Sequence, residues 1–181
     1  MDDALTTFDM VFAAGIVGLV ITTAIADQQQ WNFYETRTVY RKTAKVPAGS
    51  PYSAVSLDRG FNTHGMWAWS RHPNFAAEQG VWVTLFQWSC YATFGFWNWS
   101  GIGAMSYLIL FQASTWFTEL ITKGKYAEYA EYQKRVSKFL PMVKTAFAEP
   151  MGNHKLDSEG TKKVEKKKVS EKRTTRSKVE K

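Results

Sequence analysis

The stretch WAWSRHPNFAAEQG, Trp67 to Gly80, brings four side chains capable of chemistry into a span of eight residues: Arg71, His72, Asn74 and Glu78. Arg71 and His72 offer donors suited to phosphate or carboxylate groups. Asn74 both donates and accepts, as recognition of an amide or a ribose requires. Glu78, one helical turn further on, can accept from a hydroxyl or pair with Arg71. The spacing predicts a ligand site, and the alternative is a set of separate anchors at a membrane interface.

A long uncharged run follows directly. Residues 79–118, 40 in all, contain no Asp, Glu, Lys, Arg or His. Because a helix needs about 20 residues to cross roughly 30 Å of hydrocarbon, this length predicts two membrane spans. The turn-forming sequence FWNWSGIG in the middle predicts a hairpin of spans Gln79–Phe96 and Gly101–Phe117. The alternative is a buried helical hairpin in a soluble protein.

A further apolar segment lies near the N-terminus. Met10–Ala26 is uncharged and bounded by Asp9 and Asp27, and Leu5–Phe8 can lengthen it. A cleaved signal peptide would need a basic start, whereas this chain begins MDDAL. We therefore predict a retained third span.

The positive charges predict the topology and the domain organisation. No Lys or Arg precedes Arg37, and none lies between Arg71 and Lys123. By the positive-inside rule, the polar motifs and the C-terminal tail are cytoplasmic. Residues 1–147 form the predicted membrane domain. The Lys-rich residues 148–181 carry few large apolar side chains and are predicted to be a disordered tail. A chain anchored in the bilayer by three spans is a poor fit for a nucleic-acid-binding protein.

Two more polar stretches fall on the same predicted side of the membrane. In DQQQWNFYETR, four polar residues recur at helical spacing and so share one face: Asp27, Gln30, Tyr34 and Arg37. In TKGKYAEYAEYQKRVSKFLP, tyrosines and other apolar residues alternate with charges as in an amphipathic interfacial helix ended by Pro141. Together with the first motif, these stretches predict a pocket for an anionic cofactor above and an apolar substrate below.

The three motifs also carry a family resemblance. GMWAWSRHPNFAAE resembles the signature of the steroid 5-alpha-reductase C-terminal domain family, including its DUF1295 members. ADQQQWNF resembles the motif that precedes it, and EYAEYQKRVSKFLP resembles the closing motif. The resemblance covers roughly residues 20–142, with the motifs in the order of the family. It implies an all-α integral membrane bundle of the endoplasmic reticulum that uses NADPH to reduce double bonds of lipid or steroid-like substrates.

The resemblance also implies the site residues, all of them cofactor-binding: Asp27, Arg71, His72, Asn74, Glu78, Tyr132 and Arg135. Asn74 and Glu78 match the positions that hold the nicotinamide half, and Arg71 and His72 match a basic pair expected near phosphates or ribose. No metal is implied. Phe75 replaces the usual tyrosine. Family members have several further spans before the first motif, and no proton donor can be assigned in this chain, so its catalytic residues are unknown.

Two other functions remain open. Isoprenylcysteine carboxyl methyltransferases share a related C-terminal architecture and an R-H-P-x-Y motif but use S-adenosylmethionine. Asn74, Glu78 and the DQQQ segment favour the reductase. The third possibility is a membrane fragment that performs no catalysis.

Overall fold

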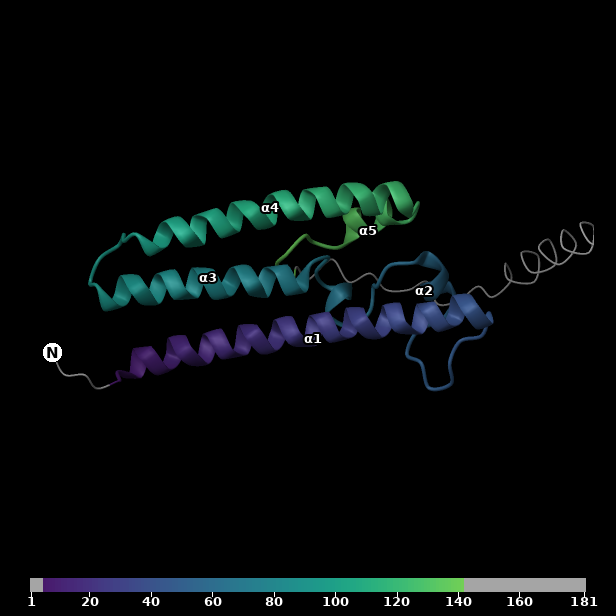
Figure 1. Cartoon of the computed structure of the whole chain (residues 1–181), viewed down its shortest axis with the longest axis horizontal. Coiled ribbons are helices and arrows are strands. Elements are labelled where there is room, and N and C mark those ends of the chain that lie inside the picture. The colour runs from purple at the N-terminus through teal and green to yellow at the C-terminus, as the bar shows by residue number, and fades with distance from the viewer. Residues whose placement is uncertain (1–4, 142–181) are drawn as a thin grey trace, which may run out of the picture. The chain divides into compact units, whose positions relative to one another are not determined.

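The structure is a computed structural model that describes residues 5–141, which belong to one compact unit. The predicted all-α fold is confirmed. The elements are α1 (Thr7–Thr43), α2 (Ala54–Arg59), the short 3₁₀ helix η1 (Gly65–Ala68), α3 (Pro73–Ala92), α4 (Ser100–Lys125) and α5 (Tyr129–Arg135) (Figure 1). The predicted tail, residues 148–181, lies outside the described residues.

Helix α1 joins the predicted N-terminal span and the first polar motif in one element. Thr6 caps it, since its hydroxyl accepts from the backbone of Asp9 while the Asp9 carboxylate accepts from the backbone of Thr6. At 37 residues the helix is about 55 Å long, well beyond the thickness of the hydrocarbon core. The span of α1 is therefore followed by several further turns that carry the polar motif. Within the described residues, α1 is the one helix long and apolar enough to cross a membrane by length and hydropathy.

The predicted hairpin is present as α3 and α4. Helix α3 lies between α1 and α4 and packs against both (Figure 1). Aromatic pairs line the two contacts: Phe12 of α1 with Trp88, and Trp82 with Tyr107 of α4 at 4.5 Å between centroids. Both helices contain Trp, Tyr and Gln side chains, which score low in hydropathy. The count of three spans therefore stays a prediction.

The observed helix ends differ from the predicted ones. Pro73 occupies the first turn of α3, where its fixed φ suits a helix start, so α3 begins six residues before the predicted span. It ends at Ala92, and Phe94 adopts a positive φ of 50° as the chain turns back. Helix α4 continues past the predicted end to Lys125. The polar motif after Trp69 is thus partly helical rather than a connecting loop.

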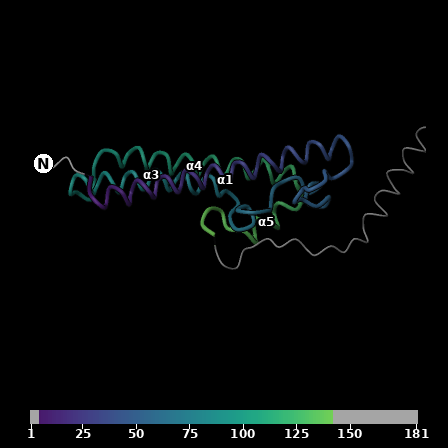
Figure 2. Tube along the Cα trace, turned by 90° about the horizontal axis from the view of Figure 1, so that it is seen from below, coloured from purple at the N-terminus to yellow at the C-terminus, as the bar shows by residue number. Residues whose placement is uncertain are grey.

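The third motif forms a shorter helix than predicted. Helix α5 ends at Arg135, and the chain beyond is extended, pairing with the residues before α3 through Arg71 N to Ser137 O (2.9 Å) and His72 N to Lys138 O (3.1 Å). The apolar face of α5 packs on Phe61, not on lipid; the buried cluster is Phe61, Tyr129, Tyr132 and Val136. Figure 2 shows α5 to one side of the layer formed by the three long helices.

Candidate functional site

The DQQQ motif of α1 lies beside the R-H-P-N motif at the start of α3. Asn74 donates through Nδ2 to Oδ1 of Asp27 at 2.8 Å. Glu78 lies one turn along α3 from Asn74 and is half-buried. Among residues 5–141, no hydrogen bond or ion pair engages the Glu78 carboxylate. We call Asp27, Asn74 and Glu78 the α1–α3 seam. Two of its members already touch, and the third offers a carboxylate to a ligand.

Gln30 and Tyr34 continue the same stripe of α1. Gln30 Oε1 is buried and has no hydrogen-bond partner within the described part of the chain. An acceptor buried without a donor costs about 1–3 kcal/mol, so it marks a place where a ligand or water donor is expected. Burial raises the pKa of the Tyr34 phenol, which therefore stays protonated. Arg37, the last residue of this stripe, carries its positive charge but donates to the Leu57 backbone oxygen and to the Tyr126 hydroxyl.

Arg71, in contrast, is engaged by the protein itself. Its guanidinium donates to both carboxylate oxygens of Glu119 on α4, from Nε at 2.6 Å and from Nη2 at 3.3 Å. Nη1 donates to the backbone oxygens of Gln133 (3.0 Å) and Val136 (2.5 Å). Arg71 is 9% exposed and Glu119 7%. This geometry clamps the segment before α3 to α4 and to the end of α5.

His72 and Gln133 complete the clamp. His72 donates from Nε2 to Oε1 of Glu119 at 3.0 Å, and Gln133 donates from Nε2 to Oε2 at 2.9 Å. Burial by itself would raise the pKa of Glu119, but the hydrogen bonds from His72, Arg71 and Gln133 and the charge of Arg71 outweigh it. They lower the pKa to about 2. Glu119 is therefore ionised at neutral pH, and we refer to Arg71, His72, Glu119 and Gln133 as the Glu119 clamp.

The two predicted residues of the third motif have different environments. Tyr132 is 1% exposed and donates to the backbone oxygen of Trp67 at 2.5 Å. Burial raises its pKa, so its hydroxyl remains a donor. Arg135 is on the surface of α5, where Nε donates to Glu131 at 2.7 Å.

The structure thus separates the predicted cofactor residues into three groups. Asp27, Asn74 and Glu78 form the seam, Arg71 and His72 belong to the clamp, and Tyr132 and Arg135 lie on the inner and outer sides of α5. Sequence reasoning missed Glu119 and Gln133 as partners of the motif. The available signal was that Glu119 is the first ionisable residue after the uncharged run, placed where a charge needs a partner.

Comparison with known proteins bears on this arrangement. The family model described as "Protein of unknown function (DUF1295)" matches residues 2–136, which include both the seam and the clamp. The chain belongs to the DUF1295 family. This confirms the family predicted from the motifs. Together with the apolar half of α1, it indicates a membrane protein.

One relative from Schizosaccharomyces pombe, an uncharacterized protein, is 40% identical over 119 residues. The match covers 66% of this chain and 35% of that protein, so the chain spans about a third of the length of its relative. No solved structure matches the chain significantly.

Proposed function

We propose that this DUF1295 chain is the cofactor-binding part of a membrane-embedded reductase. The enzyme would use NADPH to reduce a carbon–carbon double bond of a lipid or steroid-like substrate. Its membrane would be that of the endoplasmic reticulum, with the motifs facing the cytoplasm. The observation that carries the proposal is the 2.8 Å hydrogen bond between Asp27 and Asn74, which joins two of the family's motifs in one seam.

The chemistry of the seam fits the nicotinamide half of the cofactor. A nicotinamide carboxamide and its ribose present N–H and O–H donors as well as a carbonyl acceptor. Glu78 and the buried Gln30 Oε1 are acceptors without a donor among residues 5–141. Asn74 donates to Asp27 and accepts from Phe75 N, which leaves its second amide N–H for a ligand. Asp27, Asn74, Glu78 and Gln30 would therefore hold and orient the nicotinamide end.

The phosphate end needs a positive charge, and Arg71 does not supply a free one. Its donors are directed at Glu119 and at two backbone oxygens. Among the predicted residues, Arg135 is the better phosphate ligand, because its side chain is half-exposed and its partner Glu131 is exposed too. An exposed ion pair is worth only about 0–1 kcal/mol, so a phosphate can displace it.

NADPH, when bound, supplies the hydride, and a proton must reach the other carbon of the double bond. The residues of this chain bind and orient the cofactor, and no side chain is assigned here as the proton donor.

Ligand-induced stabilisation tests the proposal without requiring turnover. Purified protein in detergent is heated alone, with NADPH and with S-adenosylmethionine. A ligand at about 100 times its Kd stabilises the folded state by about 2.7 kcal/mol. We expect a shift with NADPH only. A shift with the methyl donor alone would favour a methyltransferase, and no shift with either would favour a non-catalytic membrane protein.

Glu78→Gln tests the seam itself. Loss of hydrogen bonds to a charged acceptor should weaken NADPH binding by about 1.5–3 kcal/mol. The matched control is Glu35→Gln, the same change at an exposed position of α1, which should bind NADPH as the wild type does. Equal affinity for both variants would remove Glu78 from the cofactor site.

A further inference from the structure

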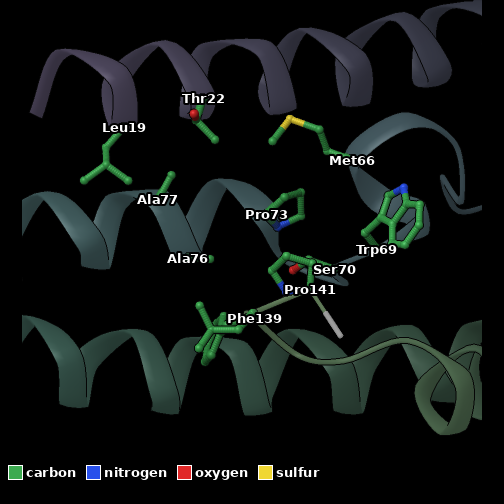
Figure 3. A pocket seen from close by; sticks show the side chains of 11 residues that line it. Leu19, Thr22, Met66, Trp69, Ser70, Pro73, Ala76, Ala77, Phe139 and Pro141 are labelled. Carbon is green, nitrogen blue, oxygen red and sulfur yellow. The ribbon is translucent and has the colours of Figure 1, made fainter. Parts of the chain in front are cut away.

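A cavity lies near the seam and has different chemistry. Its volume is about 550 Å³, within the usual range for ligand pockets. Figure 3 shows it between α1, the start of α3 and the extended chain after α5. The walls include Leu19 of α1, Ala76 of α3, Trp69 and Phe139.

The side chains that line the cavity are almost entirely apolar. Two hydroxyls reach its wall, and both are used by backbone oxygens: Thr22 Oγ1 donates to Gly18 at 2.8 Å, and Ser70 Oγ donates to Lys138 at 3.3 Å. None of its lining residues carries a charge. The occupant that this wall favours is a hydrocarbon.

The cavity is distinct from the α1–α3 seam. Ala76 lines it, and both Asn74 and Glu78 are two residues away from Ala76. The wall residues Pro73 and Ala77 are sequence neighbours of Asn74 and Glu78, but no seam residue lines the cavity itself. A molecule in this cavity therefore does not compete for the seam residues.

Its position connects the lipid-facing surface to the membrane interface. Leu19 and Thr22 lie within the apolar half of α1, next to side chains that are exposed along the span, such as Val20 (52%) and Ile21 (53%). At the other end is Trp69, 48% exposed, an aromatic residue of the kind enriched at head-group level. The cavity thus extends from the level of the predicted span to the level of the predicted interface.

A positive charge lies beside one of the wall residues. Lys138 Nζ lies 5.7 Å from the ring centroid of Phe139, a wall residue, and no carboxylate within residues 5–141 pairs with this lysine. The Lys138 backbone oxygen accepts from His72 N and from Ser70 Oγ, so this wall is fixed in place. The predicted cytoplasmic side carries anionic lipids, which complement the charge.

We propose that this cavity holds one acyl chain of an anionic phospholipid of the cytoplasmic leaflet, with the head group at Lys138. The site needs no nicotinamide cofactor and is independent of the reductase proposal. A lipid bound in this site would anchor the polar half of the protein at the membrane surface.

The test uses the full chain in nanodiscs of phosphatidylcholine with a minor fraction of phosphatidylserine that bears a diazirine in one acyl chain. After irradiation and digestion, we expect adducts on the peptide containing Ala76. Ala76→Trp fills the cavity and should abolish that adduct. Ala24→Trp, the same change at an exposed position of α1, should leave it intact. A thermal unfolding scan checks that each variant is folded, and Ala76→Leu serves if the tryptophan variant is not.

The charge is tested by moving the diazirine to phosphatidylcholine and by Lys138→Ala. We expect fewer adducts at Ala76 when the neutral lipid carries the diazirine. Lys138→Ala should reduce labelling by phosphatidylserine to the same extent. Lys134→Ala, which changes a lysine whose side chain is 77% exposed, should leave that labelling unchanged. A wild type without an adduct at Ala76 overturns the proposal and indicates a protein segment or a second copy as occupant. An adduct that survives the filled cavity, or equal labelling by both lipids, overturns it as well.

Discussion

Replacing Glu119 by Gln isolates the charge of the clamp. The amide has nearly the shape of the carboxylate but is neutral, so it mimics protonated Glu119. At neutral pH the change leaves the buried Arg71 guanidinium without its counter-charge and turns an N–H group towards other donors. Both effects destabilise the folded state.

The magnitude follows from the pKa. Glu119 has a pKa of about 2 in the folded protein against 4.5 for the free side chain. One pKa unit corresponds to about 1.4 kcal/mol, so the ionised form stabilises the fold by about 3 kcal/mol relative to the neutral form. Breaking a buried ion pair costs about 3–5 kcal/mol in other proteins, which agrees. For a chain of this size the loss amounts to a fall in Tm of about 6–12 °C.

The pH dependence separates this explanation from a general packing defect. The folded-state pKa is depressed, so the stabilisation is complete above about pH 4.5 and is lost as pH falls towards 2. Wild type and Glu119→Gln should therefore differ most at neutral pH and converge in acid. Thermal unfolding in detergent, followed by tryptophan fluorescence across this range, measures both curves.

Glu131→Gln is the matched control, because Glu131 is exposed and its bond to Arg135 lies on the surface. It should leave Tm close to that of the wild type. A gap between wild type and Glu119→Gln that stays constant down to pH 2 would refute the electrostatic account. Arg71→Met completes a double-mutant cycle: if the two residues act as a pair, the double variant is more stable than the sum of the single losses predicts.

Two further changes test the packing around the site by thermal unfolding. Gly60→Ala should destabilise the folded state by about 1–3 kcal/mol, because φ is +93° and the added Cβ would lie 2.4 Å from Arg37 Nη2 and from the Tyr126 ring. Gly49→Ala is the control: φ there is +76°, but the space around it is open, so the loss of stability should be smaller. Equal losses would show that the backbone angle alone matters. Tyr132→Phe should cost about 0.5–1.5 kcal/mol by removing the bond to the Trp67 oxygen, whereas an unchanged Tm would mean that this hydrogen bond contributes nothing.

The helices could be predicted from the sequence because their signals are local. The lack of charge over residues 79–118 and the turn formers near Asn98 predict a hairpin, and α3 and α4 form one. Helix α1 was predicted as an apolar span followed by a polar stretch at helical spacing, and it is one continuous helix. Local patterns identify such elements reliably, and their ends less so.

The end of α5 could not be predicted, because a distant segment determines it. A helical pattern continues to Phe139, yet the chain leaves the helix after Arg135 and pairs Ser137 with Ser70. That pairing joins residues 67 positions apart. The role of Arg71 is similar: its type and its neighbours suggest phosphate binding, and only the fold shows Glu119, 48 residues later, beside it.

The motif R-H-P-N therefore divides at its proline. Arg71 and His72 are fixed to α4 before Pro73, and Asn74 reaches α1 after it. Because Pro73 has a fixed φ and begins α3, the position of Asn74 depends on where the clamp holds the two residues before it. Glu119 is thus a positioning residue for the seam, although among residues 5–141 no hydrogen bond joins Glu119 to Asp27, Asn74 or Glu78. A basic pair that looks like a ligand site is in this chain bound to Glu119.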